Sequence, residues 1–470
     1  MMTTNNHNNY IALRKQFPVF TYHDFSMEQK PGNLSIKYHF SAGTSYQFRP
    51  ALVFKTGDHG HQLEITKHIE NVAFHLGMVE MLSYWKAFCS PQIVIEAGLL
   101  DHFQMNWWKK LYLWGLGEFF YTNGIPLPAD LVEFHCSGKG FDSTGITSLD
   151  QEKLIVPVGG GKDSAVCMEL LKQSGKQIIP YVVNPRLATN QVLDAAGFNP
   201  KNGIVLNREI DPLLLELNKQ GFLNGHTPFS AMLAFSSSLA AMLSGTRHIA
   251  LANESSASEP SVPGSKINHQ YSKSLEFEND FRQYATSFLH KDLNYFSLLR
   301  PLNELQISAL FSTYGAYHDV FKSCNVGSKQ DIWCCQCPKC LFTWIMLAPF
   351  MEKTRLQKIF GSDLSADGSL NDTLDKLTGL ESIKPFECVG TLEEVNVAMA
   401  HITRKLVENH EPLPDLMAHY HQTSKYEEYS ATDLRELLLA FDTCHCLQKE
   451  FLPLMDKARS VIAETITPWI

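Results

Sequence analysis

The stretch "VPVGGGKDSAVCMELLKQSG", residues 156–175, decides how the rest of the sequence is interpreted. It continues the buried-strand pattern "KLIVPV" (153–158) and leads into the helical pattern "SAVCMELLKQ", which Gly175 closes. Three glycines at a strand-to-helix turn let the backbone approach a ligand closely, and the first turn of the helix presents unpaired N–H groups toward negative charge. The stretch therefore predicts an oxyanion site.

The loop does not have the GxxxxGK[ST] pattern of a Walker loop, because Val156 stands five residues before Gly161 and Asp163 follows Lys162. A tight turn without a ligand is the alternative interpretation. The glycine loop lies between a strand and a helix and is followed by Lys-Asp-Ser, which favours phosphate binding. We expect Lys162 to add positive charge, Ser164 to donate its hydroxyl and cap the helix, and Asp163 to serve a magnesium ion.

Around this loop, short apolar runs alternate with helical patterns. Strands are expected at 176–184 and 247–253, with a helix of small residues at 227–245. This alternation predicts an α/β fold with a doubly wound parallel sheet over residues 151–350. Residues 1–150 are expected to form an N-terminal α+β domain, with two or three strands in 33–55 and helices in 63–82 and 101–121. Residues 351–470 are expected to be a C-terminal helical region, including helical patterns at 391–410 and 431–458.

Charge and composition narrow the class of ligand. The 470 residues include 40 Lys plus Arg and 49 Asp plus Glu, for a net charge of -9, which argues against non-specific binding to nucleic acid or an anionic membrane. A small or medium-sized ligand is the better expectation. No signal-peptide pattern follows the first charges, and no run approaches the ~18 apolar residues of a membrane span, so we expect a cytoplasmic protein. The oligomeric state is left open.

Cysteines cluster in "SCNVGSKQDIWCCQCPKC", residues 323–340. The spacing offers four thiolates within a short loop, enough for a closed tetrahedral zinc site, with Cys335 as the spare. Unligated thiols and a redox dithiol are the alternatives. A closed site leaves no open position for chemistry, so we interpret it as a clip that holds a substrate-facing loop. The predicted zinc ligands are Cys324, Cys334, Cys337 and Cys340. By contrast, Cys444-His445-Cys446 lies in a helical pattern and is expected to be ordinary packing.

Five polar stretches are expected at strand ends, where open α/β sheets place their ligands. Each alone is typical of a capped turn or a solvated loop, but five around one sheet edge predict a large polar site. They are "NPR" from Asn184, "NGHTP" from Asn224, "ANESSASE" from Ala252, "NHQYSKSLEFE" from Asn268 and "LLRPLNEL" from Leu298.

Residues 159–164, "GGGKDS", resemble the SGGxDS signature of the PP-loop ATP pyrophosphatase family, with Gly159 in place of the leading serine. The resemblance implies cleavage of ATP between its α and β phosphates, with adenylation of a substrate oxygen. The serine-to-glycine difference removes one hydroxyl from the phosphate cradle. A similar loop and cysteine cluster also occur together in the 7-cyano-7-deazaguanine synthases, which are about half this size and resemble only the central region.

With "NESSAS", "NHQYSKS", "RPLNEL" and "CPKC" followed by "LAPF", the central region resembles the UDP-N-acetyl-α-D-muramoyl-L-alanyl-L-glutamate epimerases. The resemblance implies an ATP- and Mg²⁺-dependent isomerase that inverts the terminal glutamate of UDP-N-acetylmuramoyl-L-alanyl-L-glutamate and releases AMP and pyrophosphate. Another PP-loop enzyme, forming a deazaguanine nitrile or thiolating a tRNA base, and a zinc-stabilised nucleotide sensor without turnover are the alternatives.

This resemblance and the polar stretches together give the candidate site residues. Asp163, His269, Lys273 and Glu254 are candidates for catalysis, the last three because they are titratable and lie in the polar loops. Arg300 is suited to holding a substrate carboxylate or phosphate. The remaining candidates are Gly159, Gly160, Gly161, Lys162, Asp163, Ser164 and Asn184 for ATP and pyrophosphate, and Asn253 and Ser255 for the substrate.

Overall fold

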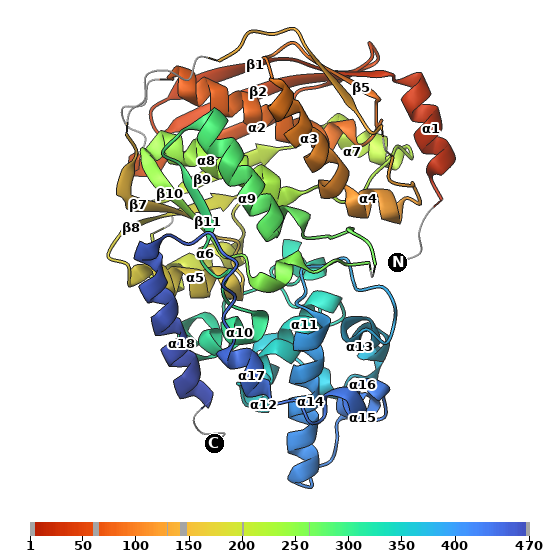
Figure 1. Cartoon of the computed structure of the whole chain (residues 1–470), viewed down its shortest axis with the longest axis vertical. Helices are drawn as coiled ribbons and strands as arrows, with labels where there is room; N and C mark the ends of the chain where they lie inside the picture. Colours follow the sequence, from red (N-terminus) through yellow and green to blue (C-terminus); the bar gives the residue numbers. More distant parts are fainter. Residues whose placement is uncertain are drawn as a thin grey trace.

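One mixed sheet of eleven strands runs through the part of the chain that the computed structural model describes, which comprises residues 5–59, 65–128, 130–141, 148–199, 202–262 and 264–466. Helices pack on both faces of the sheet, in agreement with the expected α/β class (Figure 1). The strands are β1 (Val19–Lys30), β2 (Asn33–Ala42), β3 (Tyr46–Phe48), β4 (Ala51–Lys55), β5 (Gln92–Ile95), β6 (Glu133–Cys136), β7 (Asp150–Pro157), β8 (Gln177–Val183), β9 (Ile204–Glu209), β10 (Thr246–Leu251) and β11 (Asn294–Ser297).

The parallel part of the sheet has the order β11-β10-β7-β8-β9, and every neighbouring pair in it is parallel. The chain moves from β7 to β8 and β9 on one side, then returns to place β10 and β11 on the other. The carboxyl ends of β7 and β10 are therefore neighbours at the point where the strand order reverses. In open α/β sheets this is the point where ligands bind.

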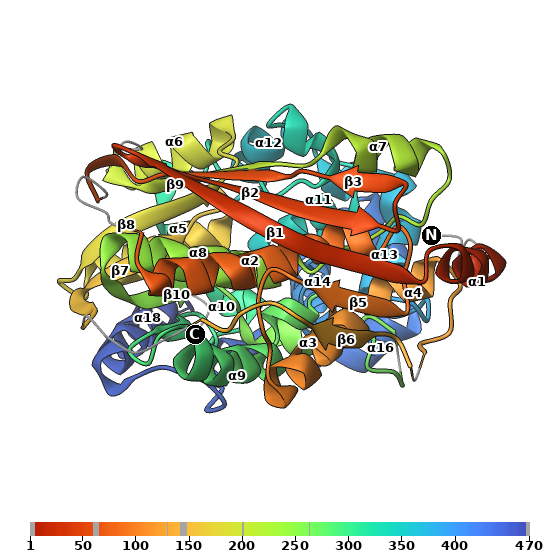
Figure 2. The same cartoon turned by 90° about the horizontal axis from the view of Figure 1, so that it is seen from above.

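The N-terminal strands continue the same sheet (Figure 2). Strand β4 pairs antiparallel with β9, and β2 joins β4 to β1. The three strands β2, β3 and β4 confirm the expectation for residues 33–55. The domain boundary near residue 150 stays a prediction, but the sheet itself crosses it, so the N-terminal strands and the glycine-loop strands form one hydrogen-bonded unit.

Two hydrophobic clusters occupy the two faces of the sheet. On one face α8 lies against β7 and β10, and α2 packs over it, which explains why α8 is rich in small residues. On the other face α5 packs against α10. The helices of the first two thirds of the chain are α1 (His7–Gln16), α2 (Lys67–Trp85), α3 (His102–Gly115), α4 (Gly117–Thr122), α5 (Lys162–Lys172), α6 (Leu187–Ala195), α7 (Pro212–Lys219), α8 (Phe229–Ser244), α9 (Leu275–Tyr284) and α10 (Glu304–Thr313).

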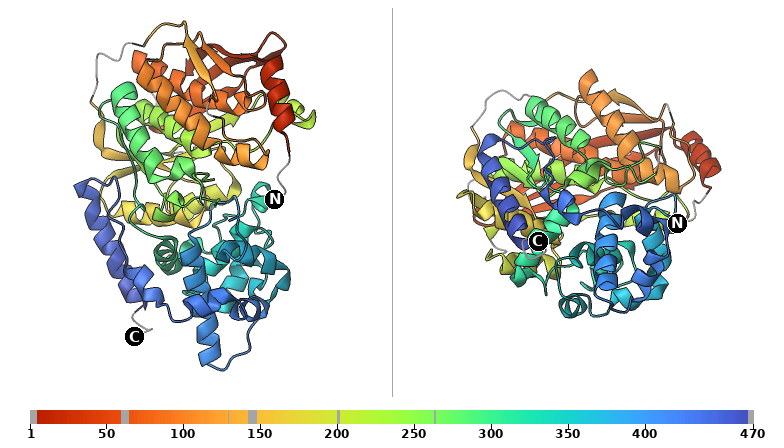
Figure 3. Two further views of the ribbon diagram at one scale, coloured as in Figure 1. Left: turned by 45° about the vertical axis from the view of Figure 1, so that its right-hand side comes forward. Right: turned by 60° about the horizontal axis from the view of Figure 1, so that its bottom comes forward.

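The C-terminal helices gather at the end of the molecule opposite β1 and β2, where Figure 3 shows them in cyan and blue. The segment 384–394 returns from them toward the parallel strands, since the Lys384 amide donates to the Ser261 carbonyl at 3.3 Å. These helices are α11 (Pro338–Leu347), α12 (Lys353–Phe360), α13 (Asn371–Thr378), α14 (Leu392–Glu408), α15 (Asp415–His421), α16 (Ser424–Tyr429), α17 (Leu434–Leu439) and α18 (Leu452–Ile466). Among the described residues, no helix combines the length and the apolar character that a membrane crossing needs.

The helix expected across residues 431–458 is wrong in its middle part. Helix α17 ends at Leu439, residues 440–448 are not helical, and α18 begins at Leu452. Gln306 of α10 donates to the carbonyls of Leu438 and Ala440, and the Asp442 carboxylate accepts the Cys444 amide at 2.8 Å. These contacts satisfy backbone groups outside a helix, so they compete with its continuation. Cys444, His445 and Cys446 therefore lie outside any helix, and Cys444 is exposed.

A buried ion pair holds the parallel part of the sheet to α2. Arg208, in β9, donates from Nε to the Glu80 carboxylate at 2.7 Å and from Nη2 to the Ser83 hydroxyl at 2.9 Å. Glu80 is fully buried in the middle of α2. A buried carboxylate without its partner is strongly destabilising, because neither water nor another cation replaces the lost contact.

We expect Arg208→Met to lower the free energy of unfolding by about 3–5 kcal/mol, because it leaves the Glu80 carboxylate buried and unpaired. Urea denaturation measures the change. The double variant Glu80→Leu/Arg208→Met removes both charges and should recover part of the loss. If Arg208→Met were as stable as the unchanged protein, the ion pair would not contribute to this packing.

Candidate functional site

The glycine loop follows β7 at the point where the strand order reverses. Gly160 has a φ of +88°, and an added Cβ there would lie 3.0 Å from the backbone of Thr189, so only glycine fits without strain. Space is open at Gly159, where an added Cβ meets no atom within 4 Å. Close packing therefore fixes the loop at Gly160, whereas Gly159 faces open space.

Helix α5 begins at Lys162 directly after this loop, with Gly161 as its N-cap residue. The prediction that Ser164 caps the helix is wrong, because its hydroxyl donates to the Gly161 carbonyl at 3.0 Å and accepts no amide of the first turn. Within the part of the chain that the structure describes, no side chain caps the first-turn amides of α5. Such amides are available to an anion at the end of the loop.

Lys162 is buried beneath the loop. Its side chain is 3% exposed, and its Nζ contacts Asp163 Oδ1 at 2.5 Å and also Glu304 Oε2. Burial alone would lower the pKa of Lys162, but the carboxylates of Asp163 and Glu304 raise it. The ammonium group therefore stays charged and is held among carboxylates, so its predicted contact with phosphate stays a prediction.

Three carboxylates meet at this point, from Asp163, Glu254 and Glu304, with one oxygen of each within 4.8 Å of the others. Glu254 and Glu304 are buried, whereas the Asp163 side chain is 31% exposed. Burial raises the pKa of Glu304 to about 7, although Lys162 opposes the shift, and burial also raises the pKa of Glu254. An all-oxygen donor set with one exposed member fits Mg²⁺, which binds through one or two carboxylates and keeps open positions for phosphates.

A second polar cluster surrounds Cys388. Lys273 Nζ donates to Cys388 Sγ at 3.1 Å, and His269 lies close enough to the same thiol to stabilise its charged form. His269 Nδ1 also lies 2.5 Å from Glu118 Oε2, which His226 Nδ1 approaches at 3.2 Å. The cluster therefore places a thiol, two imidazoles and a carboxylate close together.

The charges of this second cluster follow from its contacts. Burial would raise the pKa of Cys388, but Lys273, His269 and Lys339 lower it to about 5. Burial would lower the pKa of His269, but Cys388 and Glu118 raise it to about 9. Burial, together with His269 and Lys86, lowers the pKa of His226 to about 3. At neutral pH the cluster thus holds a thiolate, an imidazolium and a neutral imidazole.

The two clusters are adjacent, because Lys273 and Lys339 act on both. Burial would raise the pKa of Asp163, but Lys162, Lys339 and Lys273 hold it below its usual range, and the same Lys273 and Lys339 stabilise the Cys388 thiolate. Four of the five predicted polar stretches contribute side chains to this combined centre. They are represented by His226, Glu254, His269 with Lys273, and Glu304.

The fifth stretch behaves differently. Asn184 is exposed at the end of β8, with a φ of +46°, and its side-chain amide pairs with the backbone of Arg208 in β9. These contacts join the ends of two strands. Its predicted contact with ATP stays a prediction.

Of the predicted substrate ligands, Arg300 and Asn253 are buried and Ser255 is half-buried. Arg300 is 1% exposed, and its guanidinium donates to the Glu278 carboxylate and to the carbonyls of Glu254 and Lys273. It thereby fixes the two loops that carry the catalytic candidates, which favours a positioning role over direct substrate contact. The Asn253 amide donates to the Ser297 hydroxyl at 3.1 Å, and the Ser255 amide donates to the Leu302 carbonyl at 3.0 Å.

Two buried polar atoms near the centre lack a hydrogen-bond partner among the described residues, the Ser256 hydroxyl and Gln270 Oε1. Ser256 follows Glu254 by two positions, and Gln270 adjoins His269. The Gln270 amide nitrogen donates to the carbonyl of Val389 at 3.4 Å. Val389 directly follows Cys388 in the sequence. Buried polar groups nearly always have partners, so these two atoms are suited to a ligand.

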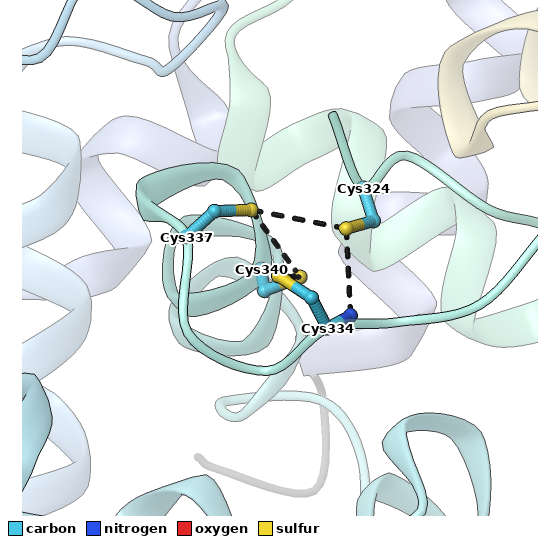
Figure 4. A group of neighbouring side chains, drawn as sticks. All are labelled: Cys324, Cys334, Cys337 and Cys340. Carbon is cyan, nitrogen blue, oxygen red and sulfur yellow. Dashed lines mark hydrogen bonds between the residues drawn. The ribbon is translucent and has the colours of Figure 1, made fainter. Parts of the chain in front are cut away.

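The four predicted zinc cysteines converge, as Figure 4 shows. The Sγ atoms of Cys324 and Cys337 are 3.9 Å apart, those of Cys334 and Cys340 3.8 Å, and those of Cys337 and Cys340 3.5 Å. Tetrahedral ligation with Zn–S bonds of about 2.3 Å places sulfurs roughly 3.8 Å apart, so the four thiols fit zinc. Cys335, which was not expected to be a ligand, lies outside this group, and its Sγ is 3.3 Å from the Phe360 carbonyl.

The segment from Lys322 through these cysteines packs against the glycine loop. The Lys322 amide donates to the Gly160 carbonyl at 3.0 Å, and Arg186 donates to the carbonyls of Ser328 and Gly159. The Asp331 carboxylate accepts the first amides of α6, from Leu187 at 3.2 Å and Ala188 at 3.3 Å. The cysteine loop therefore supports both the glycine loop and the helix beside it.

Sequence reasoning did not single out Cys388, Glu118, Glu304 or Lys339. Glu304 lay in a quoted polar stretch, and Lys339 stands between two predicted zinc ligands. Cys388 lies in "FECVG" and Glu118 in an aromatic helix, where no spacing marks either as functional. Only the fold brings them to the centre.

An α/β protein whose glycine turn, carboxylate cluster and charged thiol meet at one sheet edge has the construction of an enzyme for an anionic small molecule. Residues 12–298 match the family model of the MurL N-terminal domain, and residues 320–431 match that of the MurL C-terminal domain. The chain belongs to the MurL family, and it is an isomerase of the epimerase class.

Relatives in this family include proteins named UDP-N-acetyl-alpha-D-muramoyl-L-alanyl-L-glutamate epimerase. Those of Salinispora tropica and a Micromonospora species are both 37% identical over 331 residues, which cover 69% of this chain and 71% and 73% of the respective relatives. That of Xanthomonas oryzae pv. oryzae is 37% identical over 334 residues, covering 69% of this chain and 73% of the relative.

We expect Asp331→Ala to lower the free energy of unfolding by about 1 kcal/mol, because it removes the side-chain acceptor of the first amides of α6. Chemical denaturation measures the loss. Asp331→Asn retains one acceptor oxygen and tolerates the positive φ of this position, so it should be less damaging. Equal losses in the two variants would contradict this role for the carboxylate.

Proposed function

We propose that the protein inverts the terminal L-glutamate of UDP-N-acetylmuramoyl-L-alanyl-L-glutamate to D-glutamate, in peptidoglycan precursor synthesis, through an acyl-adenylate. ATP is the co-substrate, and AMP and pyrophosphate are released. The observation that carries the proposal is the meeting of the glycine loop, three carboxylates and the Cys388 cluster where the strand order reverses. The printed names of the relatives supply the substrate.

Adenylation gives the ATP a chemical purpose. The α-proton of a carboxylate is very hard to remove, because the resulting enolate would carry adjacent negative charges. An acyl-adenylate lacks the carboxylate charge, so the α-proton becomes far more acidic. A base then removes the proton, a proton returns on the opposite face, and water cleaves the mixed anhydride. This hydrolysis makes the overall process effectively irreversible.

The residues divide this work between the two clusters. The backbone at residues 159–161 and the first-turn amides of α5 would hold the pyrophosphate portion of ATP. Asp163, Glu254 and Glu304 would hold Mg²⁺, which neutralises phosphate charge when it is bound. The Cys388 cluster, next to these carboxylates, would face the activated glutamate. Arg300 fixes the loops that carry Glu254 and Lys273.

The four-cysteine centre is proposed to hold a structural zinc ion. Four thiolates fill its coordination sphere, so it would keep the loop in shape and would not act on the substrate. Through the Lys322 amide and Arg186 this loop contacts the carbonyls of the glycine loop. Zinc binding and ATP binding should therefore be linked.

With ATP, Mg²⁺ and UDP-N-acetylmuramoyl-L-alanyl-L-glutamate, we expect the protein to release pyrophosphate and to produce D-glutamate at the dipeptide terminus. Pyrophosphate release and chiral analysis after acid hydrolysis measure the two products. Asp163→Asn removes a charged cation ligand and should reduce both by about 100-fold or more. Pyrophosphate without D-glutamate would contradict the epimerase function, and neither product would favour a nucleotide sensor.

Metal analysis of the purified protein should give about one zinc ion per chain. Cys337→Ser removes a ligand and should lose most of the zinc and weaken ATP binding, measured by calorimetry, because the loop that supports Gly160 loses its clip. Cys335→Ser is the matched control, since that thiol lies outside the cluster, and it should keep both. Zinc retained by Cys337→Ser but lost by Cys335→Ser would contradict the ligand assignment.

A further inference from the structure

We propose that Cys388 is the base that removes the α-proton of the activated glutamate, and that His269 and Glu118 carry this proton away from the thiol. The inference rests on the proposed function and names the group that performs its proton transfer. Cys388 comes from the C-terminal helical region, outside the polar stretches from which the catalytic candidates were drawn. Its role therefore depends on placement by the fold.

The geometry gives Cys388 the surroundings of a reactive thiol. Its sulfur receives a hydrogen bond from Lys273 Nζ at 3.1 Å, and the nearby His269 also favours the charged thiol. Its backbone carbonyl accepts Lys339 Nζ, which holds the main chain in place. The residue Cys388 as a whole is only partly buried. Cationic neighbours and partial exposure are what distinguish reactive cysteines from inert buried ones.

Neighbouring groups complete the arrangement of a base with an orienting partner. His269 Nδ1 contacts Glu118 Oε2 at 2.5 Å, and the ring lies near the thiol, the order in which nucleophile, imidazole and carboxylate occur in catalytic triads. The unpaired Gln270 Oε1 lies beside His269 in the chain and offers an acceptor to a ligand. Lys273 and Lys339 then connect the thiol to the carboxylates proposed for Mg²⁺.

Charge distinguishes Cys388 from the other candidates in the same place. His269 and Lys273 hold protons at neutral pH, because each faces the Cys388 thiolate together with a carboxylate, Glu118 or Glu254. They can donate or relay a proton but cannot accept the first one. Glu254 is buried among the proposed cation ligands. His226 is also unprotonated, but its pKa of about 3 makes it a weaker base than Cys388, whose pKa is about 5.

The proposed step conserves atoms and electrons. The Cα–H bond of the acyl-adenylate breaks, an S–H bond forms on Cys388, and the electron pair stays on the carbon as the enolate of the activated acyl group. His269 gives the proton on Nδ1 to Glu118 and takes up the thiol proton in its place, and Glu118 releases its proton to solvent. A proton derived from water returns to the opposite face of Cα, and nothing is oxidised or reduced. Each inversion in D₂O should therefore place solvent deuterium on Cα.

The first test measures the reactivity of the thiol without any turnover. In the intact protein, the rate of Cys388 alkylation by iodoacetamide, followed by peptide mass spectrometry, should rise with a midpoint near pH 5. Free N-acetylcysteine should have its midpoint near pH 8.5, as ordinary thiols do. The groups that face this thiol are Lys273, His269, Lys339 and Glu387.

Lys273→Met removes one cation from the sulfur, so it should move the alkylation midpoint of Cys388 upward by at least about one pH unit. A midpoint above pH 8 in the unchanged protein would overturn the proposal. This test does not depend on the proposed substrate, so it separates failure of the inference from failure of the function.

The second test uses turnover in D₂O with ATP, Mg²⁺ and the muramoyl dipeptide. In Cys388→Ser and Cys388→Ala, we expect the ratio of α-deuterium incorporation to pyrophosphate release to fall by about 100-fold or more, the scale of general-base catalysis. A loss of folding would reduce both products together and leave this ratio unchanged. Cys444→Ser, an exposed cysteine far along the chain, is the control and should keep the ratio of the unchanged protein.

If Cys388→Ser incorporated deuterium as fast per pyrophosphate as the unchanged protein, Cys388 would not be the base. The unchanged protein could instead release pyrophosphate only when another carboxylate replaces the muramoyl dipeptide. That result would contradict the proposed substrate, whereas the pH profile of alkylation would still show whether Cys388 is a thiolate.

Discussion

Strand β7 pairs in parallel with β8 on one side and with β10 on the other, and the position of every group at the site depends on this pairing. It places the turn after β7, which carries the glycines, beside the turn after β10, which carries Glu254. Residues almost a hundred positions apart thereby share one sheet edge. Because Leu154, Ile155 and Val156 of β7 are buried on both faces of the sheet, neither turn can shift without disturbing the packing of α5 or α8.

Positive and negative side chains alternate at this edge, so each buried charge has an opposite charge beside it. Lys162 lies between Asp163 and Glu304, and Lys273 lies near both Glu254 and the Cys388 thiol. Burial alone would neutralise these groups by shifting their pKa values, and their neighbours oppose that shift. Arg300 adds no charge to the open site. Its guanidinium instead binds the carbonyls of Glu254 and Lys273, so one buried side chain sets the spacing between the two loops.

Local sequence patterns predicted what depends on local structure. The strands β7, β8 and β10, the helices α5, α8 and α14, and the convergence of four cysteines follow from periodicity, capping and spacing within short stretches. Long-range pairing carried no such signal, so the junction of β4 with β9 was not foreseen. A long-range contact also explains why one helix across residues 431–458 was wrongly predicted. Gln306, more than a hundred positions away, donates to the carbonyls at the end of α17. Cys388 and Glu118 were missed because their function arises only where distant segments meet.

The C-terminal region contributes to the candidate site. The amide of Lys339 donates to Glu387 at 2.8 Å, and its ammonium group binds the Cys388 carbonyl. Lys339 itself stands between Cys337 and Cys340, so the cysteine centre positions the Cys388 loop as well as the glycine loop. At the other end of that loop, Glu394 accepts the Glu304 amide at 2.6 Å and thus joins α14 to α10. One loop is therefore fixed both to the cysteine centre and to the helix that carries a proposed cation ligand, which makes the helical region a structural requirement for assembling the site.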